Sequence, residues 1–100
     1  MEITVVREYF VLGEQFPFLF YKNIESDLIP VSGMFFEDSG LEDENGRTYE
    51  VEILKVTIKP ENNIYHVSLK NSDKEIDKEQ LKKVFKSMKL HGWKCDTLTL

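Results

Sequence analysis

The sequence contains a single cysteine, Cys95, among its 100 residues. One thiol cannot form a disulfide within the chain, and it is too few for a cysteine-rich zinc site. No apolar run approaches the roughly 18 residues that cross a bilayer, and the N-terminus lacks the basic start of a signal peptide. We therefore expect a cytoplasmic protein without a membrane segment, and the length predicts a single domain over residues 1–100.

Basic residues are fewer than acidic ones, 13 against 18, and the net charge is −5. A domain that coats nucleic acid is basic overall, so we expect no direct nucleic-acid binding. The charge is also uneven along the chain. Residues 1–69 have a net charge of −8 and residues 70–100 a net charge of +3. This distribution predicts a dipolar molecule.

Alternation of apolar and polar residues predicts a β-rich chain with tight turns. A bulge is expected near Ile53 and Leu54, because the apolar residues change face there. Asn45-Gly46 is a hairpin-turn signal within a loop expected over residues 38–46. The predicted strands are 2–12, 16–22, 31–37, 48–59, 64–70 and 93–100.

One helix is predicted over residues 77–91. Asp77 is suited to cap its N-terminus, with Gln80 at the third helical position, and Gly92 is placed at its end. Its buried face combines Leu81, Val84, Phe85 and Met88. The expected fold class is α+β: a mainly antiparallel, strongly curved sheet of about five or six strands, in the form of a partial barrel, with this helix packed on it and a final strand.

Five carboxylates lie close together in the predicted loop. They are Glu37, Asp38, Glu42, Asp43 and Glu44. An EF-hand alignment fails because Leu41 would occupy the first ligand position, so no metal is expected. A solvated loop is the simplest interpretation, and a negatively charged docking surface for a protein partner is the functional one.

Aromatic residues are dense in the first third of the chain. Phe16, Phe18, Phe20 and Tyr21 occupy both faces of one predicted strand. Most aromatic rings are needed for the core, but one helix covers only one face of a small sheet. Any rings left over would form a self-association surface, with a homodimer as the expected product.

The remaining chemistry-bearing residues form no recognised motif. His66, His91 and Cys95 have no catalytic or metal-ligand spacing, and the five glycines form no phosphate-binding loop. Lys78, Lys82, Lys86 and Lys89 share one flank of the helix, where a solvated surface is the simplest interpretation. We expect no enzyme activity and no cofactor.

Three functions remain open from the sequence. The first is a cytoplasmic binding module that acts through its surface on another protein or a second copy. The second is an acidic inhibitor of a nucleic-acid-handling protein, of the immunity or DNA-mimic type, whose carboxylates speed association by steering. The third is a small-ligand carrier or enzyme with Tyr65, His66 or Cys95 in a pocket.

Overall fold

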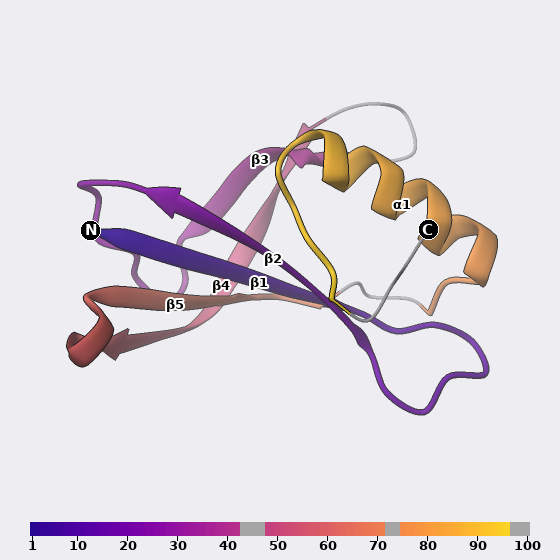
Figure 1. Ribbon diagram of the computed structural model, residues 1–100, viewed down its shortest axis with the longest axis horizontal. Helices are drawn as coiled ribbons and strands as arrows, with labels where there is room; N and C mark the ends of the chain where they lie inside the picture. Colours follow the sequence, from indigo (N-terminus) through magenta and orange to yellow (C-terminus); the bar gives the residue numbers. More distant parts are fainter. Residues whose placement is uncertain (43–47, 72–74, 97–100) are drawn as a thin grey trace.

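The computed structural model describes residues 1–42, 48–71 and 75–96. They form a five-stranded sheet and one helix (Figure 1). The elements are β1 (Glu2–Tyr9), β2 (Phe18–Glu25), β3 (Phe35–Glu42), β4 (Thr48–Lys59), the short 3-10 turn η1 (Pro60–Asn62), β5 (Ile64–Leu69) and α1 (Lys78–Leu90).

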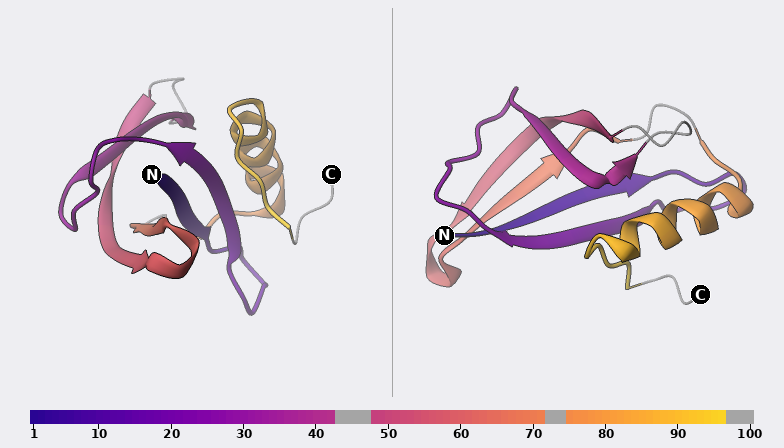
Figure 2. Two further views of the ribbon diagram at one scale, coloured as in Figure 1. Left: turned by 60° about the vertical axis from the view of Figure 1, so that its left-hand side comes forward. Right: turned by 90° about the horizontal axis from the view of Figure 1, so that it is seen from above.

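The strands lie in the order β2-β1-β5-β4-β3. β1 and β5 are parallel, and every other neighbouring pair is antiparallel. The sheet curls into a half-barrel, and α1 lies along its open side (Figure 2). The predicted α+β class and curved sheet are therefore confirmed.

The bulge and the helix cap agree with the sequence patterns. The register between β4 and β5 shifts between Ile53 and Lys55, as the change of apolar face predicts. The Asp77 side chain accepts from the Gln80 backbone N–H at 2.8 Å, and the Gln80 side chain accepts from Asp77 N–H at 3.1 Å. This capping box fixes where α1 begins.

The core lies between the concave face of the sheet and α1. Val5, Phe20 and Val67 are each at most 1% exposed, and they face Leu81, Phe85 and Met88 of the helix. The Phe20 ring packs edge-on against both Tyr9 and Phe85. These contacts bury the apolar faces of the sheet and the helix together.

Two sequence predictions about strand bounds were wrong, and a third falls partly outside the described residues. The third strand, predicted at 31–37, is β3 at Phe35–Glu42. Residues 31–34 form a turn instead, in which Gly33 has φ +93°. Residues 38–42, predicted as the start of a loop, belong to β3. β1 ends at Tyr9, and Val11 forms only an isolated bridge to Ile76. Of the predicted final strand 93–100, the described residues 93–96 form an antiparallel bridge from Lys94 to Tyr21, and residues 97–100 lie outside the described part.

Candidate functional site

Asp38 is the centre of a polar cluster that joins both edge strands to the segment after α1. Its carboxylate accepts from Lys22 Nζ on β2 at 2.8 Å and from the Trp93 indole Nε1 at 2.9 Å. It also accepts from the Gly40 backbone N–H at 2.8 Å. We call Asp38, Lys22, Gly40 and Trp93 the Asp38 cluster. These contacts connect the two edge strands of the half-barrel with each other and with the segment after α1. The cluster therefore has a structural role.

The close packing of this cluster depends on a residue without a side chain. A Cβ atom at Gly40 would lie 2.6 Å from Cδ1 and Nε1 of Trp93, well inside van der Waals contact. Trp93 itself is 2% exposed. Glycine at position 40 therefore allows the indole ring to lie directly against β3.

The environment of Asp38 shifts its acidity. Burial raises the pKa, but hydrogen bonds from Lys22, Trp93 and Gly40 outweigh it, and the pKa of Asp38 is lower than its ordinary value. The carboxylate is therefore ionised and committed to intramolecular partners at neutral pH. It is not available to a partner protein.

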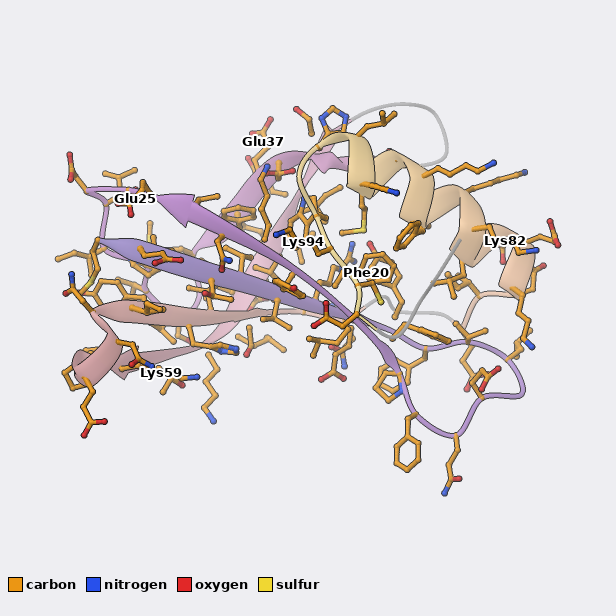
Figure 3. The ribbon with its side chains drawn as sticks, viewed as in Figure 1. Phe20, Glu25, Glu37, Lys59, Lys82 and Lys94 are labelled. Carbon is orange, nitrogen blue, oxygen red and sulfur yellow. The ribbon has the colours of Figure 1, made fainter. Side chains whose placement is uncertain are left out.

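This result bears on one of the five residues of the predicted acidic docking surface, Asp38. Asp38 is bonded within the Asp38 cluster, and only Glu37 of the five carboxylates is seen as an exposed side chain in the described part of the chain. Glu42 ends β3, and Asp43 and Glu44 lie outside the described residues. Figure 3 shows Glu37 projecting outward from β3. Glu37 and Asp38 therefore have different environments, and a docking role for Glu42, Asp43 and Glu44 stays a prediction.

The four aromatic residues of the predicted self-association surface differ in how far they are exposed to solvent. Phe20 is 1% exposed and was wrongly assigned to a surface, because it fills the space beneath α1 (Figure 3). Phe18 packs partly against the core. Tyr21 is half-buried, and its hydroxyl donates to Asp96 Oδ1 at 3.1 Å. Phe16, in the β1–β2 connection, is 75% exposed, so it alone of the four is largely open to solvent.

The larger exposed apolar surface lies elsewhere, on the β2–β3 connection and the start of β3. We call it the apolar segment. It consists of Leu28, Ile29, Val31, Met34 and Phe35, which are each 49–80% exposed. Sequence reasoning assigned residues 31–37 to a strand and did not single out this surface. The available signal was a run of large apolar residues around Pro30 and Gly33, where a turn leaves them no core to enter.

Residues 32–34, in the second half of the apolar segment, are bonded to β4. Gly33 N–H donates to Ile53 O at 2.8 Å, and Ile53 N–H donates to Met34 O at 2.7 Å. The Ser32 hydroxyl donates to Leu54 O at 2.9 Å, and Leu54 is itself half exposed. Met34 and Phe35 thus project from, or directly after, a backbone that is bonded to β4, whereas these bonds do not include Leu28 and Ile29.

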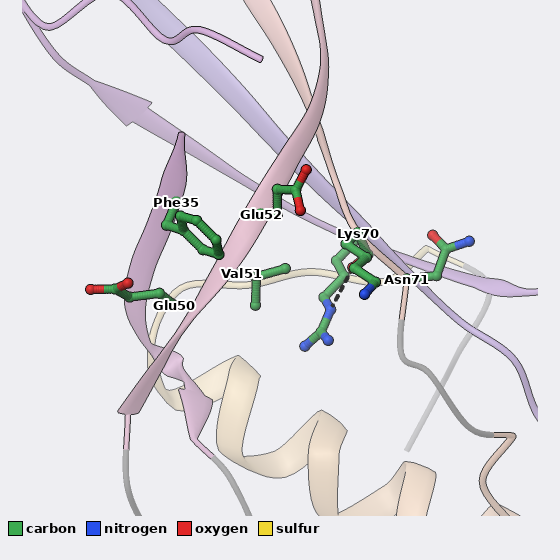
Figure 4. Close-up of a pocket in the computed structure, with 7 residues that line it drawn as sticks. Phe35, Glu50, Val51, Glu52, Lys70 and Asn71 are labelled. Atoms are coloured by element: carbon green, nitrogen blue, oxygen red, sulfur yellow. Dashed lines mark hydrogen bonds between the residues drawn. The ribbon is translucent and has the colours of Figure 1, made fainter. Parts of the chain in front are cut away.

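A hollow of about 280 Å³ lies where β4 separates from the end of β5 (Figure 4). Arg7, Phe35, Glu50, Val51, Glu52, Lys70 and Asn71 line it. Arg7 is 5% exposed, and its guanidinium donates to Lys70 O at 3.1 Å and to the Tyr9 hydroxyl at 3.0 Å. These bonds give Arg7 a structural role, since a buried charge needs such partners.

The residues considered for catalysis remain apart. His66 lies on β5, opposite Thr57 of β4 and Thr4 of β1, and Cys95 is buried after α1. Burial and the nearby Lys59 and Lys55 lower the pKa of His66. Within residues 1–42, 48–71 and 75–96, no three His, Cys, Asp or Glu side chains are grouped to hold a metal ion.

Comparison of the chain with protein-family models, with curated proteins and with solved structures finds no match in any of the three. In the described part of the chain, no helix has the length and apolar character needed to cross a membrane. The surfaces themselves are therefore the basis for a functional proposal.

Proposed function

We propose that this chain is a non-enzymatic binding module that contacts another protein through the apolar segment. The observation that supports it is the exposure of five large apolar side chains within residues 28–35, a stretch bonded to β4 at residues 32–34. Contiguous apolar patches on soluble domains commonly mark interaction sites. A partner would remove these side chains from water, and the bonded backbone of residues 32–34 lowers the entropic cost of binding.

The experiment compares two variants that lose similar apolar surface at different places. One is Leu28→Ser/Ile29→Ser/Val31→Ser, within the apolar segment. The control is Phe16→Ser/Leu90→Ser, where the side chains are 75% and 84% exposed but outside it. Each tagged protein is used to capture partners from the native cell extract, after its thermal melting confirms the fold.

We expect the control to retain a protein captured by the wild type, and the triple variant to lose it. Equal capture by all three chains would contradict the proposal. Sedimentation of the isolated proteins addresses self-association. A wild-type dimer that becomes a monomer only in the triple variant would identify the partner as a second copy.

The acidic-inhibitor function stays a prediction. It requires a set of carboxylates facing one partner, and Asp38 is occupied by Lys22 and Trp93. Of the other acids in that set, Glu37 is the one whose side chain is described, and it is exposed. We therefore place the interaction on the apolar segment.

A further inference from the structure

We propose that the occupant of the apolar segment is an extended, basic segment of another protein, which adds as a strand to the edge of β3 at Phe35. This inference rests on the proposed function and specifies the chemistry of its partner. Three observations support it: the position of β3 in the sheet, the direction of the backbone at Phe35, and the charge around the apolar segment.

β3 is a terminal strand of the sheet. β2, at the opposite end, is partly covered, since Tyr21 and Lys94 exchange backbone hydrogen bonds of 2.9 and 2.8 Å. Among the described strands, β3 is paired only with β4. A terminal strand presents backbone donors and acceptors to an incoming extended chain.

The direction of the backbone follows from the bond between Ile53 and Met34. Because Met34 O points toward β4, the N–H and C=O of Phe35 point away from it, as alternate peptide groups do in a strand. The Phe35 side chain is 60% exposed. An added strand can therefore bond the Phe35 backbone and cover its ring at the same time.

The side chains around Phe35 favour a cationic partner. In the β3–β4 register, Phe35 is opposite Glu52 and Glu37 is opposite Glu50, so the four share one face. Phe36 and Val51 face the core instead. Residues 23–37 and 48–54 contain five acidic residues and no lysine or arginine, and two basic residues, Lys70 and the buried Arg7, line the hollow beside Phe35. Acidic residues therefore outnumber basic ones around Phe35 by five to two. Lysine or arginine side chains of the partner would complement this face, whereas an acidic partner would be repelled.

The test uses a synthetic peptide of alternating valine and lysine, about nine residues long, within the usual length of a strand. Binding to the intact wild-type chain is measured by fluorescence anisotropy. We expect affinity in the micromolar to millimolar range that weakens as salt rises from about 0.05 to 0.5 M. A peptide with glutamate in place of lysine should not bind.

Two pairs of variants separate charge from backbone pairing. Glu50→Gln/Glu52→Gln should weaken binding by about fivefold, whereas Glu61→Gln/Glu79→Gln, with the same net charge but distant acids, should not. Phe35→Pro removes the outward N–H, and Phe35→Ala retains it. The edge position tolerates proline, so we expect the proline variant to bind more weakly than the alanine variant.

A peptide methylated on alternate backbone nitrogens gives the same test without changing the protein, and it should bind at least tenfold more weakly. Equal binding of the methylated and unmodified peptides would overturn strand addition. Equal binding of the lysine and glutamate peptides, or no binding of either at millimolar concentration, would overturn the basic partner. The capture experiment above judges the proposed function separately, since it does not depend on peptide charge.

Discussion

Asp38 of β3 accepts a hydrogen bond from the indole of Trp93, which lies 55 residues later in the sequence. The same carboxylate binds Lys22 of β2, so one side chain connects the two edges of the sheet to the segment after α1. The side chains of Lys22 and Asp38 are only 22% and 11% exposed. Their interaction is therefore less screened than a surface ion pair.

Removing the Asp38 carboxylate should destabilise the fold. We expect Asp38→Ala to lower the free energy of unfolding by about 3 kcal/mol, because Trp93 Nε1 and Lys22 Nζ lose their acceptor. Asp38→Asn keeps one acceptor oxygen and should cost about 1 kcal/mol. Urea denaturation measures both, with Glu61→Gln as the change at an exposed acid that is expected to alter stability little. Equal stability of Asp38→Ala and the wild type would show that the cluster contributes nothing.

The Asp38 cluster also predicts how stability depends on pH. Because the folded-state pKa of Asp38 is lower than its ordinary 3.8, its contribution is present above that pH and is lost as pH falls through the folded value. Wild type and Asp38→Asn should therefore converge in stability below about pH 4. The lowered pKa of His66 acts at higher pH in both proteins and cancels in the difference. A difference that is constant from pH 7 to pH 2 would refute this assignment.

Gly40→Ala should disturb the packing of Trp93. The added methyl group would lie 2.6 Å from the ring, so the ring or β3 must move, at a cost of about 1–3 kcal/mol. The sequence contains one tryptophan, which makes its fluorescence a direct reporter of this contact. We expect a red-shifted emission and a lower melting temperature, while Ser39→Ala, at an exposed neighbouring position, leaves both unchanged.

Two phenylalanines four residues apart should respond very differently to truncation. Phe20→Ala removes a ring that contacts Tyr9 and Phe85, and it should cost about 3–5 kcal/mol. Phe16→Ala removes a ring that is 75% exposed and should cost less than about 0.5 kcal/mol. Thermal or chemical denaturation at one protein concentration checks both. A large effect at Phe16 would indicate burial of that ring in an oligomer.

The start of α1 and the bulge of β4 could be predicted from the sequence, because each depends on residues close together in the chain. The Asp77–Gln80 pair marks the start of α1, and the change of apolar face in β4 marks its bulge. The end of β1 and the extent of β3 depend instead on distant partners. β3 continues through acidic residues that resemble a loop, because pairing with β4 and the contacts of Asp38 stabilise it there.

The candidate surfaces were harder to predict, since exposure is a property of the whole fold. Alternation in strand 16–22 could not show that Phe20 faces the core while Phe16 precedes the strand. In the sequence, nothing distinguishes Asp38 from its acidic neighbours. Its partners Lys22 and Trp93 are distant in the chain and lie beside it only in the fold. Arg7 interrupts the apolar pattern of its strand. Only the fold shows that its guanidinium donates hydrogen bonds to Lys70 O and to the Tyr9 hydroxyl.

The parallel pairing of β1 with β5 constrains the order in which the chain can assemble. The β1–β2 and β3–β4 hairpins are each formed from neighbouring segments, but they share no strand pairing, and among the described strands β5 is the one that pairs with both. On a ribosome, the sheet cannot become continuous until Leu69 has emerged, and the Asp38 carboxylate cannot be enclosed until Trp93 follows. Between the emergence of Lys59 and that of Leu69, the nascent chain therefore holds two hairpins that no strand yet connects, and their apolar faces remain available to chaperones.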